Sequence, residues 1–201
     1  MNQILLMDYG VGNSAKIKQV LEMKSLNVTL VDFKLNKDFE NFQTLILPGV
    51  GSFDGCMTSL ENSGNLNFIK SFALTGKKII GICAGAQIIF EASEEGQCKG
   101  LGLINGNVIA NQKTVNTLNV GRKMVEFDDP DYLKFSSDRF YFSHSFQMNP
   151  NEKNSIIART ADGIPAVVKE NNTYGIQFHP EKSGMLGIDF LSHVILEKTT
   201  N

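Results

Sequence analysis

The sequence predicts an α/β fold, with a parallel sheet built by the N-terminal half and antiparallel strands added by the C-terminal half. In the first half, apolar runs of strand length alternate with amphipathic stretches, which is typical of parallel strands joined by helices. The second half contains short strand patterns separated by hairpin-like turns such as Asp162-Gly163. We expect one domain over residues 1–201, since no repeat, low-complexity stretch or linker interrupts the chain.

The composition is that of a soluble globular protein. The 201 residues are 42% hydrophobic and 20% charged, with a formal net charge of −2. This balance gives no electrostatic reason to expect binding to nucleic acid or to a membrane surface. No apolar run reaches the length of a transmembrane helix.

The three cysteines, Cys56, Cys83 and Cys98, are an odd number without a C-x-x-C pair, and only three histidines are present. We therefore expect neither a disulfide framework nor a metal site, and nothing in the sequence indicates a cofactor. Reduced thiols fit the cytosol. The chain opens on a short apolar run without a basic region or cleavage site, which predicts a first strand, no signal peptide and a cytoplasmic protein.

The N-terminal half is expected to form four strands. They lie at residues 4–7, 28–31, 44–47 and 79–82. A glycine-rich turn ends the first strand, and Asn13 and Ser14 then mark the N-cap of a helix. Such a turn can hold a phosphate, but the G-x-G-x-x-G fingerprint is absent, which favours a plain tight turn. The polar residues 34–43 are expected to form a surface connection.

Residues 77–95 are the segment around which the rest of the chain is organised. They read K-K-I-I-G-I-C-A-G-A-Q-I-I-F-E-A-S-E-E, a buried strand followed at once by an apolar pattern of helical length. Gly81 and Gly85 flank Cys83 at a distance of two residues, as in a nucleophile elbow, where a tight turn strains the nucleophile's backbone. The N-terminus of the following helix favours negative charge on the sulfur. The alternative is a buried structural cysteine at a strand end.

The third strand runs into Pro48, which begins the loop P-G-V-G-S-F over residues 48–53. A proline followed by glycines ends the strand ladder and frees the backbone N–H groups beyond it. In a parallel sheet this loop lies on the same edge as Cys83, where such folds place their sites. It is either an ordinary turn or a second donor, beside the Ala84 N–H, for an oxyanion hole.

The C-terminal half is expected to form short strands and one helix. The strand patterns lie at residues 101–110, 121–127, 139–142, 155–160, 165–168 and 173–178, and the helix at 185–196.

A histidine follows the last of these strands. His179 stands where the apolar pattern stops, with Pro180 and Glu181 after it, so the carboxylate can hold one tautomer of the imidazole. Together with Cys83 this pair predicts a cysteine nucleophile with a histidine base. His144 is an alternative base.

Four motifs together resemble those of the class I, or triad, glutamine amidotransferases. They are G-I-C-A-G-A-Q at residues 81–87, G-I-Q-F-H-P-E-K-S at 175–183, P-G-V-G-S-F at 48–53 and Y-F-S-H-S-F at 141–146. Within that family the chain is similar, essentially end to end, to the glutaminase subunits of imidazole glycerol phosphate synthases. The resemblance implies a flavodoxin-like, three-layer α/β/α domain with a mostly parallel central sheet.

The resemblance also implies a function. Such a subunit hydrolyses L-glutamine to glutamate and ammonia through a cysteinyl thioester, and passes the ammonia to a barrel-shaped synthase partner in a heterodimer. It implies Cys83 as nucleophile, His179 as base and Glu181 as the residue that orients it. Further positions are implied for the oxyanion hole (Val50, Gly51 and Ala84) and for the glutamine pocket (Gln87, Glu95, His144, Ser145 and Phe146).

One segment departs from the family pattern. Where histidine-pathway subunits typically carry K-V-P-H-M-G-W-N facing the synthase, residues 116–123 read N-T-L-N-V-G-R-K, and the protein contains no tryptophan. The partner interface is expected to include Asn119, Arg122, Lys123 and Lys182. The departure keeps a second pathway open, in which paralogous subunits supply ammonia to a sugar amidotransferase that makes acetamidino sugars. A cysteine hydrolase of a related fold is a remoter alternative, and so is a non-catalytic regulatory module.

Overall fold

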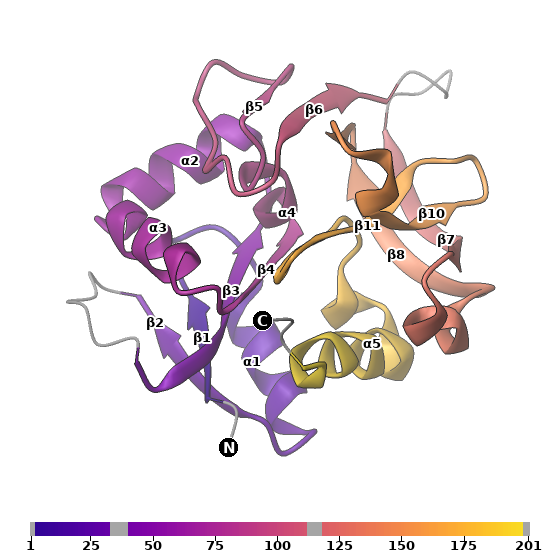
Figure 1. Cartoon of the computed structure of the whole chain (residues 1–201), viewed down its shortest axis with the longest axis horizontal. Coiled ribbons are helices and arrows are strands. Elements are labelled where there is room, and N and C mark those ends of the chain that lie inside the picture. The colour runs from indigo at the N-terminus through magenta and orange to yellow at the C-terminus, as the bar shows by residue number, and fades with distance from the viewer. Residues whose placement is uncertain (1–2, 33–39, 112–117, 199–201) are drawn as a thin grey trace.

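A computed structural model describes residues 3–32, 40–111 and 118–198. A nine-stranded sheet, in the order β2-β1-β3-β4-β12-β11-β10-β7-β8, runs between two layers of helices (Figure 1). Four of its eight neighbouring pairs are parallel and four are antiparallel. The predicted α/β fold is confirmed, with the antiparallel pairs all contributed by strands of the C-terminal half.

The strands fall into three groups. The parallel group is β1 (Gln3–Met7), β2 (Asn27–Val31), β3 (Phe42–Gly49), β4 (Lys78–Cys83) and β12 (Thr173–Ile176). The antiparallel group is β7 (Asn119–Phe127), β8 (Asp138–His144), β10 (Ile156–Thr160) and β11 (Pro165–Glu170). A separate three-stranded sheet contains β5 (Ala92–Ser93), β6 (Gly106–Ala110) and β9 (Phe146–Pro150).

The helices cover both faces of the large sheet. They are α1 (Ser14–Glu22), α2 (Phe53–Asn62), α3 (Leu66–Leu74), α4 (Ala84–Ile88) and α5 (Gly184–Leu196), with short 3₁₀ helices η1 (Pro130–Phe135), η2 (Lys153–Ser155) and η3 (Pro180–Lys182). None of the helices in the described ranges has the length and apolarity needed to cross a membrane.

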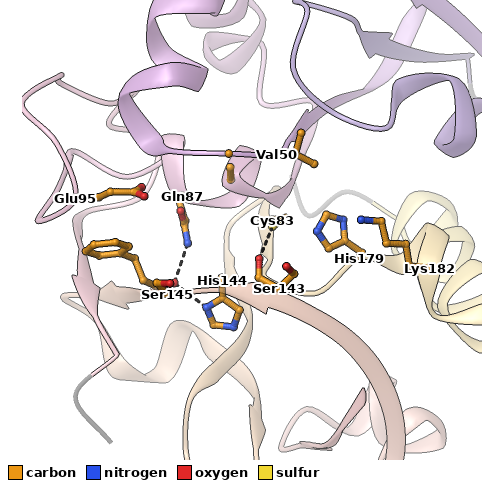
Figure 2. A pocket seen from close by; sticks show the side chains of 12 residues that line it. Val50, Cys83, Gln87, Glu95, Ser143, His144, Ser145, His179 and Lys182 are labelled. Atoms are coloured by element: carbon orange, nitrogen blue, oxygen red, sulfur yellow. Dashed lines mark hydrogen bonds between the residues drawn. The ribbon is translucent and has the colours of Figure 1, made fainter. Parts of the chain in front are cut away.

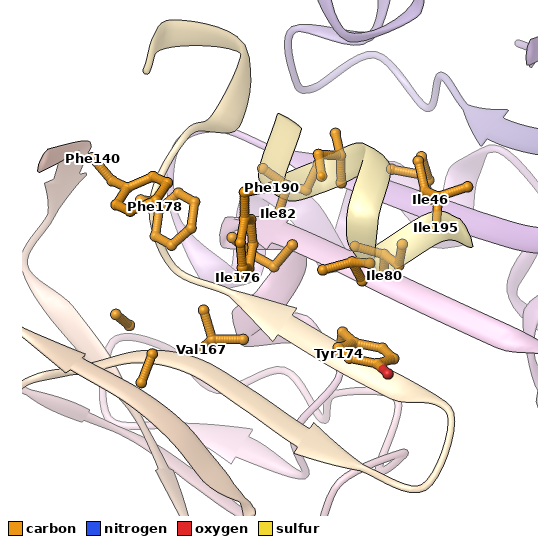
Figure 3. Packing of buried hydrophobic residues seen from close by; sticks show 14 of the residues in the cluster. Ile46, Ile80, Ile82, Phe140, Val167, Tyr174, Ile176, Phe178, Phe190 and Ile195 are labelled. Atoms are coloured by element: carbon orange, nitrogen blue, oxygen red, sulfur yellow. The ribbon is translucent and has the colours of Figure 1, made fainter. Parts of the chain in front are cut away.

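Strand alternation divides the core into two layers. Leu6 packs with α1 and α5, whereas its neighbour Leu5 packs with α2, α3 and α4. In the first layer, Phe190 and Ile195 of α5 lie over the sheet residues Ile80 and Ile82 (Figure 3). Because both faces of these strands are covered, they read as unbroken apolar runs in the sequence.

The helix after Cys83 is shorter than the sequence pattern predicts, ending at Ile88. The carbonyls of Ile88 and Ile89, which a longer helix would use, accept hydrogen bonds from the backbone N–H groups of Leu101 and Leu103, both at 2.8 Å. The strand expected from residue 101 therefore begins only at Gly106. Tertiary hydrogen bonds override the local helical pattern here.

Other elements of the structure also differ from the elements that the sequence predicts. The sequence patterns did not place helices α2 and α3 or strand β9. Strand β3 begins two residues before the predicted strand and continues through Pro48 to Gly49, where the sequence predicts that the proline ends it. Most of the expected surface connection at 34–43 lies outside the described residues, which omit 33–39.

The carboxyl ends of β3, β4 and β12 meet at one edge of the sheet. Gly49 pairs with Cys83 in the β3–β4 register, and Ile176 pairs with Ile82 in the β12–β4 register. The chain leaving β12 therefore reaches His179 beside the end of β4. Open α/β sheets form ligand sites at this edge.

Candidate active site

The backbone at Cys83 is strained. Its φ is 55° and its ψ is −114°, in the positive-φ region that side-chain-bearing residues rarely adopt. The turn is also crowded, because a Cβ on Gly85 would lie 1.9 Å from the carbonyl oxygen of Leu47, and one on Gly81 would lie 2.4 Å from that of Gly85. The tight turn expected from the flanking glycines is therefore present, and only glycine fits at these two positions.

His179 and Glu181 form a buried pair at the end of β12. The His179 N–H donates to the Tyr141 carbonyl at 2.8 Å, which fixes the chain before Pro180 opens η3. The imidazole Nδ1 lies 2.9 Å from Oε1 of Glu181, and only 2% of His179 is exposed. Because an ionised carboxylate only accepts, Nδ1 carries the proton. The other ring nitrogen, Nε2, is left free to face Cys83, whose interaction with His179 helps to raise the pKa of the histidine.

The environment of this pair favours its charged form. Burial opposes positive charge on His179, but the hydrogen bonds with Cys83 and Glu181 outweigh it and raise its pKa to about 9. Burial likewise opposes charge on Glu181, yet the bonds from His179 and from Asn13 lower its pKa below the ordinary value. At neutral pH the pair is therefore an imidazolium beside a carboxylate.

Cys83 and His179 open onto a pocket of about 160 Å³. Figure 2 shows the lining running from Glu95 and Gln87, past Cys83, to His179 and Lys182. The pocket brings together every residue expected in the oxyanion hole and in the glutamine site: Val50, Gly51, Ala84, Gln87, Glu95, His144, Ser145 and Phe146. Ser143 also lines it and was not singled out by the sequence; its carbonyl accepts the Cys83 thiol at 3.9 Å.

Two pocket residues are held by bonds that set what they offer to a ligand. Gln87 donates from Nε2 to the Phe146 carbonyl at 2.8 Å and to Gln177 at 3.3 Å, which leaves its amide oxygen to the pocket. The carboxylate of Glu95 accepts the backbone N–H of Phe53, the first residue of α2, at 2.8 Å. The pocket wall thus presents a fixed acceptor and a fixed negative charge.

His144 is held as a neutral ring. Its Nδ1 lies 2.8 Å from the carbonyl of Phe146, which can only accept, so Nδ1 is the donor. Its Nε2 then accepts from Nδ2 of Asn119 at 2.8 Å. Burial lowers the His144 pKa to about 4. With both nitrogens engaged away from the sulfur, this geometry favours His179 over His144 as a base.

The expected interface residues do not share one surface. Arg122 and Lys182 are exposed, and Nη2 of Arg122 donates to the Lys182 carbonyl at 3.3 Å, where Lys182 borders the pocket. Lys123 lies on the other face of β7, with Nζ 3.9 Å from the Asp162 carboxylate.

The interface role expected for Asn119 is wrong for this conformation. The residue is 1% exposed, because strand alternation turns its side chain inward, to His144. Asn116 and Thr117 lie outside the described residues.

One contact to this site has no local signal in the sequence. Asn13, interpreted above only as a helix cap, donates from Nδ2 to Oε1 of Glu181 at 2.8 Å, across 168 positions. In the described part of the chain, no group of three or more His, Cys, Asp or Glu side chains is arranged to hold a metal ion.

Comparison with known proteins identifies the family. The family model for glutamine amidotransferase class-I matches residues 5–193. The chain is 38% identical over 192 residues to the imidazole glycerol phosphate synthase subunit HisH of Staphylococcus aureus (strain Mu50), covering 96% of each protein. It is 37% identical over 194 residues to the HisH subunit of Caldanaerobacter subterraneus, covering 94% of this chain and 95% of that protein.

Solved structures share the fold at lower identity. A chain of the PurLQS structure from Thermotoga maritima has a TM-score of 0.75 at 18% identity and covers 96% of this chain and 97% of that chain. A crystal structure described as a glutamine amidotransferase has a TM-score of 0.74 at 19% identity, covering 94% and 98%. The match of the family model over nearly the whole chain, together with these relatives, shows that the protein belongs to the class I glutamine amidotransferases.

Proposed function

We propose that this chain is a glutaminase subunit, which hydrolyses L-glutamine to glutamate and ammonia and passes the ammonia to a barrel-shaped synthase. The observation that carries the proposal is the meeting of the strained Cys83 with the buried His179–Glu181 pair in one pocket. A nucleophile, a base and a group that orients the base are the parts that acyl transfer requires.

The first half of the reaction forms a thioester. The Cys83 sulfur, as thiolate, attacks the side-chain amide carbon of glutamine while His179 is the imidazolium. The carbon–nitrogen bond then breaks, and the Nε2 proton of His179 goes to the leaving nitrogen, which departs as ammonia. Glu181 stabilises the imidazolium before this transfer and keeps Nε2 directed at the sulfur.

The second half releases glutamate. Water attacks the thioester carbon and gives a proton to Nε2 of His179, and the carbon–sulfur bond breaks to return the thiolate. Both halves pass through an oxyanion, for which backbone N–H groups of the Val50–Gly51 loop and of Ala84 are the donors we propose.

The rest of the pocket suits the amino-acid end of glutamine. The Glu95 carboxylate complements the α-ammonium group, and the Gln87 amide oxygen supplies a further acceptor. His144, Ser145 and Phe146 line the pocket beside Gln87. The three cysteines are free thiols, which agrees with a cytoplasmic enzyme.

The partner we propose is a barrel synthase of the imidazole glycerol phosphate type, in histidine biosynthesis, because the HisH relatives are named as subunits of that enzyme. A second partner is favoured by one observation. Arg122 is exposed and donates to the carbonyl of Lys182, which lines the pocket. It stands where histidine-pathway subunits typically carry a tryptophan, and this favours a paralogous barrel that serves a sugar amidotransferase.

A glutaminase assay with and without each barrel tests the proposal. We expect glutamate release that a barrel stimulates and that Cys83→Ala abolishes while the variant stays folded. Hydrolysis of amides other than glutamine without any partner effect would instead indicate a cysteine hydrolase of related fold. A folded chain without activity under any of these conditions would indicate a regulatory module.

A further inference from the structure

Asn13 occupies the N-cap position of α1 but does not cap that helix. Its backbone φ and ψ are −92° and 44°, and its side chain makes no capping hydrogen bond. An asparagine at this position usually accepts an N–H of the first turn and stabilises the helix by about 1 kcal/mol. Here the side-chain amide instead donates from Nδ2 to Oε1 of Glu181 at 2.8 Å.

The turn before α1 fixes Asn13 in this position. The carboxylate of Asp8 accepts the Ser14 hydroxyl at 2.6 Å and the Gly10 N–H at 3.2 Å. Gly12 has a φ of 130°, and a Cβ there would lie 2.9 Å from Cβ of Pro48. The end of β1, the start of α1 and the end of β3 are therefore packed together, so that Asn13 is held from two sides.

The Glu181 carboxylate accepts few hydrogen bonds from the described residues. Its Oε1 accepts from both His179 Nδ1 (2.9 Å) and Asn13 Nδ2 (2.8 Å). Its Oε2 is buried and has no hydrogen-bond partner among the described residues. Two side-chain bonds on a single oxygen therefore hold this carboxylate, beside a backbone contribution from its own N–H.

The chemistry of the second donor matters. A cation in place of Asn13 would pair with Glu181 and compete with the imidazolium for it, whereas a neutral amide stabilises the carboxylate without adding charge. Burial works to raise the pKa of Glu181, but the larger contribution of His179 and the bond from Asn13 outweigh it and lower this pKa below the ordinary value.

We propose that Asn13 is a positioning residue of the active site: its side-chain amide holds the Glu181 carboxylate, and through it the tautomer and direction of His179. The inference rests on the proposed glutaminase chemistry and adds the β1–α1 turn to the machinery of the site. It predicts that the asparagine is selected for the reaction and not for the helix that it begins.

Asn13→Ser separates these two roles. Serine is an equally good N-cap but is too short to reach Glu181, so the gained cap offsets part of the stability lost with the bond and the variant should stay folded at the assay temperature. We expect kcat for glutamine to fall about tenfold to a hundredfold, the loss of one hydrogen bond to a charged group, with KM changed less than twofold. Asn62→Ser, at the exposed last residue of α2, is the matched control and should leave both constants unchanged.

Asn13→Asp supplies a second measurement that loss of folding cannot mimic. The substitution keeps the shape but places a second carboxylate against Glu181, so one of the two must bind a proton at higher pH. We expect kcat to fall further than in Asn13→Ser and the acidic limb of its pH profile to move to higher pH.

Alkylation of Cys83 by iodoacetamide distinguishes failure of this inference from failure of the proposed function, since it needs no glutaminase activity. An inactive parent chain would overturn the glutaminase proposal, while slower Cys83 alkylation in Asn13→Ser would still support the positioning role. Parental kcat and alkylation rate in Asn13→Ser would overturn the inference. The inference would also be overturned if Asn13→Ser lowered the melting temperature so far that unfolding explained the lost activity.

Discussion

Asn119 donates a hydrogen bond from Nδ2 to Nε2 of His144 at 2.8 Å, and this bond identifies the tautomer of His144. With Nε2 accepting, Nδ1 must carry the proton that it donates to the Phe146 carbonyl. The same carbonyl accepts from Gln87, so His144 and Gln87 together fix the wall of the pocket at Phe146. The two histidines of the site therefore differ in role: one supports the pocket, and the other faces the sulfur.

This difference predicts opposite kinetic effects. His144→Ala should raise KM for glutamine about tenfold, the value of one buried hydrogen bond, with kcat changed only a few-fold. His179→Ala should lower kcat by several orders of magnitude, since nucleophile and base act as a unit. Glu181→Gln should cost less than His179→Ala, because in the proposed mechanism Glu181 orients the histidine and does not transfer the proton. Steady-state kinetics with saturating barrel measure all three, and a dead His144→Ala beside a near-normal His179→Ala would reverse the assignment.

Local signals explain which parts of this site the sequence could predict. Cys83 can be predicted as a nucleophile because Gly81 and Gly85, which its tight turn requires, lie within two residues of it. His179 can be predicted because Pro180 follows it directly and marks the end of its strand. The contact between Asn13 and Glu181 spans 168 positions, so no local pattern carries it.

The error at Asn119 was avoidable in part. Residues 119 and 122 of one strand must point to opposite faces, so Asn119 and Arg122 could not both face a partner. The early end of α4, by contrast, could not be predicted. It results from hydrogen bonds that the backbone N–H groups of Leu101 and Leu103 donate to carbonyls at the end of the helix, and no sequence pattern indicates these contacts.

The cysteines should differ sharply in reactivity. Cys56 is fully buried, and burial, followed by the charges of Cys83 and Glu95, raises its pKa to about 12. Burial and the adjacent Asp54 raise the pKa of Cys98. Since thiolates are the reactive form, a glutamine-analogue alkylator should label Cys83 alone at pH 7.5.

Peptide mass mapping after one equivalent of label measures this selectivity. Cys56→Ala and Cys98→Ala should still be labelled and should retain glutaminase activity, whereas Cys83→Ala should lose both. Labelling spread evenly over the three cysteines would contradict the elbow as the reactive position.

The His179 pKa of about 9 predicts a dependence of stability on pH. Its ordinary value is 6.5, so the folded chain binds the proton more tightly than the unfolded chain. The stabilisation is therefore complete below pH 6.5, declines from pH 6.5 to 9 and is absent above pH 9. Over that window it amounts to on the order of 3 kcal/mol.

Urea unfolding of the parent chain and of His179→Gln at pH 6, 7.5 and 9.5 measures the effect. The difference in free energy of unfolding between the two chains should shrink as pH rises. A difference that stays constant or grows with pH would mean that His179 is not held as an imidazolium in the folded chain.

The exposed face of β7 beside Lys182 bears on the proposed choice of a barrel partner. Arg122 and Lys182 supply two exposed cations there, and Val120 and Met124, exposed on the same face of β7, are 48% and 39% accessible. A barrel shaped to receive tryptophan would bury Arg122 without a counter-charge, at a cost of roughly 2–4 kcal/mol, or about 30- to 1000-fold in affinity. A barrel with an acidic residue at that place would pair with it.

The second candidate partner therefore predicts weak stimulation by a standard histidine-pathway cyclase and strong stimulation by a paralogous barrel with an acidic residue opposite Arg122, whereas the histidine-pathway proposal predicts the reverse. Titrating glutaminase activity against both barrels from the same cell, each with its own ligand, measures the preference. Arg122→Trp should shift stimulation towards the histidine-pathway barrel, whereas Lys123→Ala, a cation removed from the other face of β7, should leave the preference unchanged. If the histidine-pathway barrel stimulates the parent chain equally or better, Arg122 does not select the partner, and the chain serves histidine biosynthesis like the HisH subunits to which it is similar.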